Sequence, residues 1–165
     1  YTIGRTRDYA SLHPGTVLPF PVHEINRGGQ ATYHGPGQLV GYPVTDLNRR
    51  GRDLHVYVTS LENALIESCA RFGVAARIRE GLVGVWVEDR KIASIGVGVK
   101  KWIAMHGFAI NLTRESLPPF LAITPCGIQD VQMTCLENEM PASREKGELM
   151  RRFGDVFAEI WEKNS

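Results

Sequence analysis

Two residues of this sequence, a cysteine and a lysine, have the types and settings that nucleophilic chemistry needs. Cys126 follows Thr124-Pro125 and precedes Gly127, so the chain is rigid on one side of the thiol and free on the other. That setting is typical of an exposed turn rather than of a packed face. From the residues alone, Cys126 is either a reactive thiol or an ordinary turn residue.

Lys91 ends the charged turn EDRK and begins the segment KIASIGVGV. The simplest interpretation is a solvated turn lysine. The alternative follows from thiol chemistry, because the thiolate is the attacking form and a free cysteine with a pKa of about 8.5 is mostly protonated at neutral pH. A nearby ammonium raises the thiolate fraction, so a pair of Lys91 and Cys126 is chemically sensible.

The other two cysteines are better explained as core residues. Cys69 lies one position from the apolar stripe of an expected helix, and Cys135 shares a strand face with Val131 and Met133. Three scattered cysteines form neither a disulfide framework nor a C-x-x-C zinc pair. A reducing cytoplasm therefore fits best.

The five histidines show no metal-binding spacing, so we expect no metal. The G-x-G of GVGVKK lacks the third glycine and the helix of a dinucleotide site, and no P-loop motif is present. We therefore expect no cofactor. His34 and His106 stand beside glycines in polar, loop-like contexts, where a structural hydrogen-bonding role fits each better than acid–base chemistry.

Residues 25–44, INRGGQATYHGPGQLVGYPV, combine five glycines and two prolines with a dense cluster of Arg, Gln, Thr, Tyr and His. Glycine lacks a Cβ, so its amide can approach another molecule closely, but it loses more entropy on folding than any other residue. One interpretation is a surface loop with ordinary turn chemistry. The other is a loop that holds a ligand with backbone amides.

The elements that must position these residues can be predicted from periodicity. Short β-rich runs at 22–26 and 39–45 flank the glycine loop, which makes it a connection between strands. Asp53 can cap a helix whose apolar residues recur three and four apart until Gly73 ends it.

Strands are expected in the middle of the chain and a helix at its end. The run at 83–87 and the run at 92–99 form an antiparallel hairpin, a third strand covers 103–112, and VQMTCL alternates like a strand. Ser143 can cap a last helix. Its apolar face is Leu149, Phe153, Val156, Phe157, Ile160 and Trp161. The fold class is α+β, with a mixed, mainly antiparallel sheet flanked by helices.

The composition describes one globular domain over residues 1–165, with 43% hydrophobic and 22% charged residues. No apolar run approaches the roughly 18 residues of a membrane span. A formal net charge of +1 argues against general nucleic-acid binding, which needs a basic excess on one face. The first residues, YTIGR, lack an initiator Met and signal-peptide features. We therefore expect the sequence to begin partway along a longer chain, inside a strand.

Several motifs in a fixed order carry a resemblance to a known family. RGGQATYHGPGQLVGYP is followed by RKIASIGV, HGFAINL and ITPCG. In this order and at these separations, the sequence resembles the octanoyltransferases of lipoate biosynthesis, also called lipoyl(octanoyl) transferases. The resemblance covers roughly residues 1–127 and implies the catalytic-domain fold of biotin and lipoate protein ligases. The family generally carries a further N-terminal strand and helix, which we expect to be missing from this sequence.

The resemblance implies transfer of an octanoyl group from octanoyl acyl carrier protein to a lysine of a lipoyl domain, in dehydrogenase E2 subunits or the glycine-cleavage H protein. Cys126 is implied as the nucleophile that carries the acyl group as a thioester, and Lys91 as its partner, in ping-pong order. The implied substrate-binding residues are Arg27, Gly28, Gly29, Gln30, Ala31, Thr32, Tyr33, His34, Ser94, Ile95, Gly96, Gly107, Phe108 and Ala109.

Two other functions stay open. An ATP-dependent lipoate or biotin protein ligase would share the fold but would not need Cys126. A non-catalytic acyl-binding scaffold would need neither Cys126 nor Lys91. We expect a cytoplasmic monomer with no nucleic-acid or membrane partner. Basic residues gather at 49–52 and at 100–101, either as two solvated loops or as patches that steer an acidic carrier protein.

Overall fold

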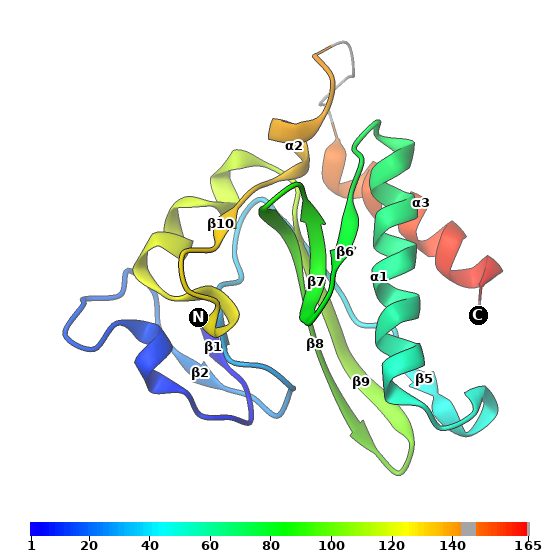
Figure 1. Ribbon diagram of the computed structural model, residues 1–165, viewed down its shortest axis with the longest axis horizontal. Helices are drawn as coiled ribbons and strands as arrows, with labels where there is room; N and C mark the ends of the chain where they lie inside the picture. The colour runs from blue at the N-terminus through cyan, green and yellow to red at the C-terminus, as the bar shows by residue number, and fades with distance from the viewer. Residues whose placement is uncertain (143–147, 165) are drawn as a thin grey trace.

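The structure is a computed structural model that describes residues 1–142 and 148–164. At the centre of the described part of the chain is a seven-stranded sheet (Figure 1). Five strands run in the order β4, β9, β8, β7 and β6 with antiparallel neighbours, while β5 pairs antiparallel with β9 and β10 pairs parallel with β8. The strands are β4 (Gln38–Gly41), β5 (Thr45–Asp46), β6 (Arg77–Arg79), β7 (Leu82–Val87), β8 (Arg90–Lys100), β9 (Ile103–Asn111) and β10 (Gln132–Met133).

A smaller sheet of three strands belongs to the N-terminal part of the chain. Its middle strand is β1 (Thr2–Ile3), which runs parallel to β2 (His23–Glu24) and antiparallel to β3 (Ala31–Thr32). Short 3-10 helices connect many of the strands. They are η1 (Tyr9–Leu12), η2 (Leu47–Arg50), η3 (Arg114–Ser116), η4 (Pro118–Ala122) and η5 (Pro125–Gly127).

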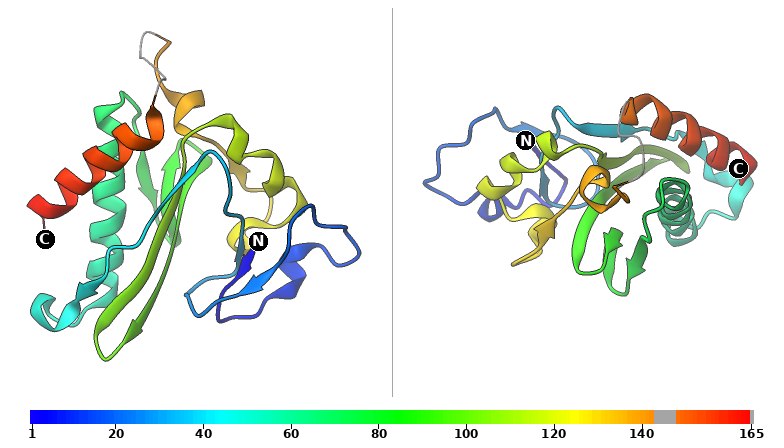
Figure 2. Two further views of the ribbon diagram at one scale, coloured as in Figure 1. Left: turned by 180° about the vertical axis from the view of Figure 1, so that it is seen from behind. Right: turned by 90° about the horizontal axis from the view of Figure 1, so that it is seen from above.

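The central sheet separates two layers, which Figure 2 shows from above. The long helices α1 (Leu54–Arg71) and α3 (Leu149–Lys163) pack together on one side, and the N-terminal segment with β1 and β2 lies on the other. A short helix, α2 (Leu136–Glu139), follows β10. None of the helices in the described part of the chain has the length and apolar character that a membrane span requires.

The register between β8 and β9 sends small residues to the face opposite the helices. Ser94 lies opposite Ala109, and Gly96 lies opposite Gly107. Side chains alternate between the two faces along a strand. The neighbouring opposed pair, Ala93 and Ile110, therefore points the other way, into the core beneath the helices. The face toward the N-terminal segment is therefore left with room beside the sheet.

The helix predicted from Asp53 is confirmed at both ends. The Asp53 carboxylate accepts hydrogen bonds from the His55 and Val56 amides at 2.8 and 3.0 Å, which satisfies two amides that the first turn leaves free. Gly73 follows the helix with a φ of +80°, the left-handed conformation in which helices often end.

The C-terminal helix is also present, beginning at Leu149 after Glu148. Its buried residues Phe153, Phe157 and Ile160 are among those predicted to form its apolar face. Ser143, the predicted cap, lies outside the described residues. The predicted hairpin and third strand correspond to β7, β8 and β9, and the mainly antiparallel sheet flanked by helices is confirmed.

The runs that flank the glycine loop differ from their predicted form. The run at 39–45 is interrupted, because Pro43 has no amide hydrogen to donate between β4 and β5. The run at 22–26 forms a strand only over His23–Glu24, in the smaller sheet. VQMTCL forms only the two-residue strand Gln132–Met133 before α2 begins. The glycine loop thus bridges two sheets and contributes β3 on the way.

Candidate active site

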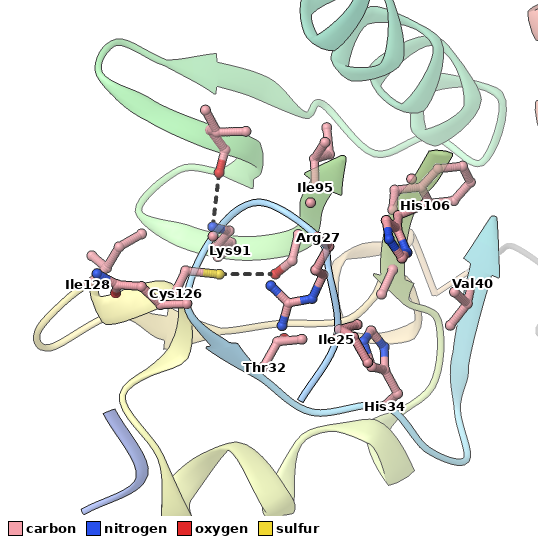
Figure 3. A pocket seen from close by; sticks show the side chains of 18 of the residues that line it. Ile25, Arg27, Thr32, His34, Val40, Lys91, Ile95, His106, Cys126 and Ile128 are labelled. Carbon is pink, nitrogen blue, oxygen red and sulfur yellow. Dashed lines mark hydrogen bonds between the residues drawn. The ribbon is translucent and has the colours of Figure 1, made fainter. Parts of the chain in front are cut away.

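A pocket of about 250 Å³ lies between the glycine loop and the face of β8 and β9 that carries the small residues. Figure 3 shows Cys126 and Lys91 at one end of it and His106 and Val40 at the other. Segments far apart in the sequence meet here. Of the predicted site residues, those that line the pocket are Arg27, Gly29, Gln30, Thr32, His34, Lys91, Ser94, Ile95, Gly96, Gly107, Phe108, Ala109 and Cys126.

Three predicted binding residues do not line the pocket but hold the glycine loop in place. The Gly28 amide donates to the Val97 carbonyl at 2.8 Å and so ties the loop to β8. Ala31 is fully buried in β3. Tyr33 packs its ring 5.5 Å from the Tyr1 ring, in a small aromatic core beneath the loop.

Cys126 lies on the short turn η5 in a conformation that few residues adopt. Its φ of +55° is in the left-handed region, where a side chain carries a steric cost, and Gly127 follows with a φ of +67°. Strain of this kind is concentrated at functional sites. The Cys126 thiol is partly exposed and donates to the Ser94 hydroxyl, with 3.7 Å between sulfur and oxygen.

The segment before Cys126 is anchored to η1. The Thr124 amide donates to the Ser11 carbonyl at 2.7 Å, and the Thr124 hydroxyl is hydrogen-bonded to the His13 ring at 2.9 Å. Pro125 then fixes one backbone angle just before the thiol. The turn that carries Cys126 is therefore held by contacts on the side away from the pocket.

Lys91 is buried, so the interpretation as a solvated turn lysine is wrong. Only 1% of the residue is exposed, and its Nζ donates to the Val83 carbonyl at 3.0 Å. The ammonium also lies 5.3 Å from the centroid of the Trp86 ring, a cation–π distance. A lysine is rarely buried so completely without a specific role. Sequence reasoning from the charged turn missed this because β8 begins at Arg90 and turns Lys91 inward.

The other two cysteines are buried, as predicted, and are poor nucleophiles. Burial raises the pKa of the Cys69 thiol to about 12. It also raises the pKa of Cys135, which is fully buried at the start of α2. Because the thiolate is the reactive form, Cys126 is the cysteine best placed for chemistry among the three.

Arg27 is an organising residue at the centre of the pocket. It is 8% exposed, and its guanidinium donates to the Thr2 carbonyl and hydroxyl at 3.0 and 2.9 Å and to the Gly28 carbonyl at 3.0 Å. Burial lowers the pKa of Arg27, and the nearby Cys126 opposes that shift. In the described part of the chain, Arg27 Nε, Gln30 Oε1 and Thr32 Oγ1 are buried without a hydrogen-bond partner. The pocket thus offers polar atoms to a ligand.

The two histidines singled out in the sequence both line the pocket. Burial, and then the charge of Arg27, lower the pKa of His34 to about 4, so its ring is neutral at neutral pH. His106 is part of β9, the strand predicted over 103–112, although its polar context beside a glycine had suggested a loop. Its φ of +62° lies in the left-handed region, which residues other than glycine seldom adopt. No group of three metal-binding side chains is found among residues 1–142 and 148–164.

The model of the lipoyl protein ligase A/B catalytic domain matches residues 1–158. The chain belongs to this family. Among its relatives, the octanoyltransferase of Geobacter metallireducens is 56% identical over 95% of this chain and 72% of the relative. That of Geobacter sulfurreducens is 52% identical over 84% of this chain and 57% of the relative. The resemblance inferred from the motifs is confirmed.

Solved structures place the fold within the lipoyl and biotin ligase group. A lipoate-protein ligase A bound with ATP aligns with a TM-score of 0.67 at 17% identity, over 98% of this chain and 68% of that one. A biotin protein ligase from Aquifex aeolicus aligns with a TM-score of 0.53 at 15% identity, over 77% of this chain and 54% of that one. At these identities the likeness concerns the fold alone, and it confirms the predicted fold.

In this lipoyl protein ligase A/B catalytic domain, several pocket residues were not predicted. Val40 and Tyr42 enter from the edge of β4, Leu82 and Val83 from β7, and Ile128 from beyond η5. A signal was available for the first pair, because they follow the glycine loop directly. Strand pairing alone brings β7 to the site, so no local pattern could have identified Leu82 and Val83.

Proposed function

We propose that this chain transfers an octanoyl group from octanoyl acyl carrier protein to a lysine of a lipoyl domain, with Cys126 carrying the group as a thioester. The acceptors would be E2 subunits or the glycine-cleavage H protein, and the reaction is an early step of lipoate synthesis. Octanoyl transfer is the activity named for the relatives. The observation that carries the assignment is the strained, partly exposed Cys126 in a pocket that also contains the buried Lys91.

The first half-reaction acylates the cysteine. The Cys126 thiolate attacks the carbonyl carbon of the donor thioester, the new C–S bond forms, and the bond to the carrier sulfur breaks. The Lys91 ammonium gives its proton to the leaving carrier thiolate. One thioester replaces another of similar energy, so the step needs no ATP.

The second half-reaction releases the acyl group to the acceptor. The lysine amine of the lipoyl domain attacks the Cys126 thioester, an amide bond forms, and the Cys126 thiolate leaves. Neutral Lys91 takes the proton that the amine loses and returns to its ammonium form. Each protein substrate thus uses the same pocket in turn, in ping-pong order.

The polar atoms beside Cys126 suit the charge that develops in both steps. A tetrahedral intermediate places a negative charge on the former carbonyl oxygen, and prearranged donors are most effective there. The Arg27 guanidinium and the Thr32 hydroxyl line the pocket and can serve this charge. The acyl tail would run along the small residues of β8 and β9 that face the pocket, past Gly96 and Ala109 toward Val40.

Intact-mass measurement after mixing with octanoyl acyl carrier protein, without ATP, tests the proposal. We expect one octanoyl adduct, which Cys126→Ala abolishes together with transfer to a lipoyl domain. Cys69→Ala and Cys135→Ala are matched controls and should keep the adduct. An adduct that persists in Cys126→Ala contradicts the assignment, and labelling that requires ATP would instead favour a ligase.

A further inference from the structure

Helix α1 buries a carboxylate against the sheet, and the proposed chemistry leaves it without a task. Glu62 is 5% exposed and lies among apolar neighbours such as Leu61 and Leu65. No ion pair with Glu62 is found in the described part of the chain. Its Oε1 accepts a hydrogen bond from the Gly84 amide on β7 at 2.9 Å. A buried charged group is costly, so this contact needs an explanation.

The peptide that bonds to Glu62 also bonds to Lys91. The Gly84 amide and the Val83 carbonyl belong to one peptide unit, and the carbonyl accepts from Lys91 Nζ at 3.0 Å (Figure 3). In a trans peptide the amide hydrogen and the carbonyl oxygen point in opposite directions. The carboxylate on the helix side and the ammonium on the pocket side are therefore connected through a single peptide of β7.

Glycine at position 84 is what allows this arrangement. Its φ of +127° is a conformation that other residues rarely adopt, and a Cβ there would lie 2.7 Å from Lys91 Cε and 2.6 Å from the Ala93 carbonyl oxygen. The β7 to β8 register also shifts between Val85 and Trp86. The strand is thus locally irregular at the point where the Lys91 side chain crosses it.

We propose that Glu62 is a positioning residue that acts on Lys91 through the Val83–Gly84 peptide. A carboxylate that accepts from an amide polarises the peptide, and a polarised carbonyl is a stronger acceptor for an ammonium. The negative charge, one peptide away, also offsets the cost of burying the positive one. Because the carboxylate does not bind Lys91 directly, two of the three ammonium hydrogens stay available for Cys126 and the substrate.

This inference rests on the proposed role of Lys91, and its test uses variants of graded chemistry. Glu62→Gln keeps an oxygen that can accept from the Gly84 amide but loses the charge, whereas Glu62→Leu loses both. The measurements are single-turnover acylation by octanoyl acyl carrier protein and alkylation of Cys126 by iodoacetamide at pH 7. Residues that hold a metal ligand in position typically change affinity or activity by about 10- to 100-fold when they are replaced. By analogy, we expect both rates to fall by about tenfold in Glu62→Gln and by up to about 100-fold in Glu62→Leu. KM should stay unchanged.

Ser68→Ala is the matched control on the same helix. Ser68 is fully buried, and its hydroxyl donates to the Ala64 carbonyl within α1 at 2.7 Å, so its replacement removes a buried hydrogen bond of the helix and not the one that Glu62 makes to Gly84. It should leave both rates unchanged. Where Glu62→Leu fails to fold, Glu62→Gln still carries the test.

The decisive arm repeats the Glu62 changes in a Lys91→Ala background. When Glu62 acts through Lys91, its replacement has less than about a twofold further effect on Cys126 alkylation there. An equal loss in both backgrounds would overturn the proposal, as would unchanged rates in Glu62→Leu. A normal alkylation rate in Lys91→Ala alone would overturn the proposed role of Lys91 and the action of Glu62 with it.

Discussion

The Cys126 thiol donates to the Ser94 hydroxyl across 3.7 Å, although the two residues are 32 positions apart in the sequence. Ser94 lies on β8, the strand that also carries Lys91. One strand therefore presents both a hydroxyl and an ammonium to the pocket that contains the thiol. Since a hydroxyl hydrogen can rotate, Ser94 can accept from the thiol and donate to the thiolate in turn.

Lys91 is predicted to move a proton as well as to supply charge. Lys91→Ala should slow both half-reactions by about 100-fold or more, the usual scale of general acid–base catalysis. Lys91→Arg keeps the charge but cannot release a proton at neutral pH, so it should stay slow. Single-turnover kinetics with donor and acceptor measure each step separately. A fully active Lys91→Arg would limit Lys91 to an electrostatic role.

Gly96 is predicted to be required for the approach of the glycine loop to β8. A Cβ at Gly96 would lie 2.9 Å from the Gly28 carbonyl oxygen and 3.0 Å from Arg27 Cδ, so Gly96→Ala must displace the loop. We expect the acylation rate to fall by about tenfold or more, as small displacements of reacting groups are costly.

The matched control for Gly96 is Gly154→Ala in α3, where an added Cβ meets only Leu39 Cδ2 at 3.9 Å. This change should raise the free energy of unfolding by about 0.5–1 kcal/mol, through helix propensity, without altering the rate. Equal rates for wild type and Gly96→Ala would show that the loop position is not critical.

Local patterns predicted the parts of the fold that depend on neighbours in sequence. The helix after Asp53 and the β7–β8 hairpin follow from capping and alternation, which are properties of short segments. The division into two sheets could not be predicted in this way. The strands at His23–Glu24 and Ala31–Thr32 are only two residues long and form because β1 lies between them.

The site was predicted from motifs more completely than from residue chemistry. Cys126 could be identified as unusual from its Pro and Gly neighbours, but the burial of Lys91 depends on the gap that Gly84 leaves on another strand. The strand that contains His106 was predicted, but the left-handed φ of +62° at this residue was not. Contacts between strands decide both cases, and a single sequence does not display them.

Acid is predicted to destabilise the protein through His34. Its pKa is lowered to about 4 by burial and then by Arg27, whereas a histidine in the unfolded chain titrates near 6.5. Between these values the unfolded chain binds a proton that the folded chain does not. Stability is therefore complete above pH 6.5 and falls as the pH drops toward 4, by up to about 3 kcal/mol.

Urea unfolding between pH 7 and pH 4.5 measures this effect. Replacement by asparagine, His34→Asn, should flatten the dependence on pH, since the titrating group is gone. His55→Asn, at an exposed position on α1, is the control and should keep the wild-type slope. Parallel curves for wild type and His34→Asn would assign the acid sensitivity to other groups.

The two basic segments predicted from the sequence lie side by side. Strand β5 pairs with β9 just beyond the tip of the β8–β9 hairpin, and the Leu47 amide donates to the Trp102 carbonyl at 2.8 Å. The Arg52 guanidinium lies 5.9 Å from the centroid of the Trp102 ring. The side chain of Arg49 is 88% exposed. Lys100 and Lys101 are exposed at the hairpin tip, so the cations form one surface.

This surface is predicted to attract an acidic carrier protein, since opposite charges steer association and are screened by salt. Replacing Arg49, Lys100 and Lys101 by Ser should raise the KM for octanoyl acyl carrier protein by about tenfold. This is the effect expected from losing three exposed ion pairs with the carrier, each of modest strength. Arg50 is left in place because it lies over the Trp161 ring. The kcat, and transfer from a small octanoyl thioester, should be unchanged.

A second triple variant removes the same charge elsewhere, which separates docking from net charge. Arg71, Arg151 and Lys163 lie on α1 and α3, and the ion pairs that they form with other described residues are exposed, so their replacement by Ser should leave the KM for the carrier unchanged. The KM of the wild type should also rise with salt, and less steeply in the first variant. A KM that responds neither to salt nor to the loss of Arg49, Lys100 and Lys101 would assign carrier docking to another surface.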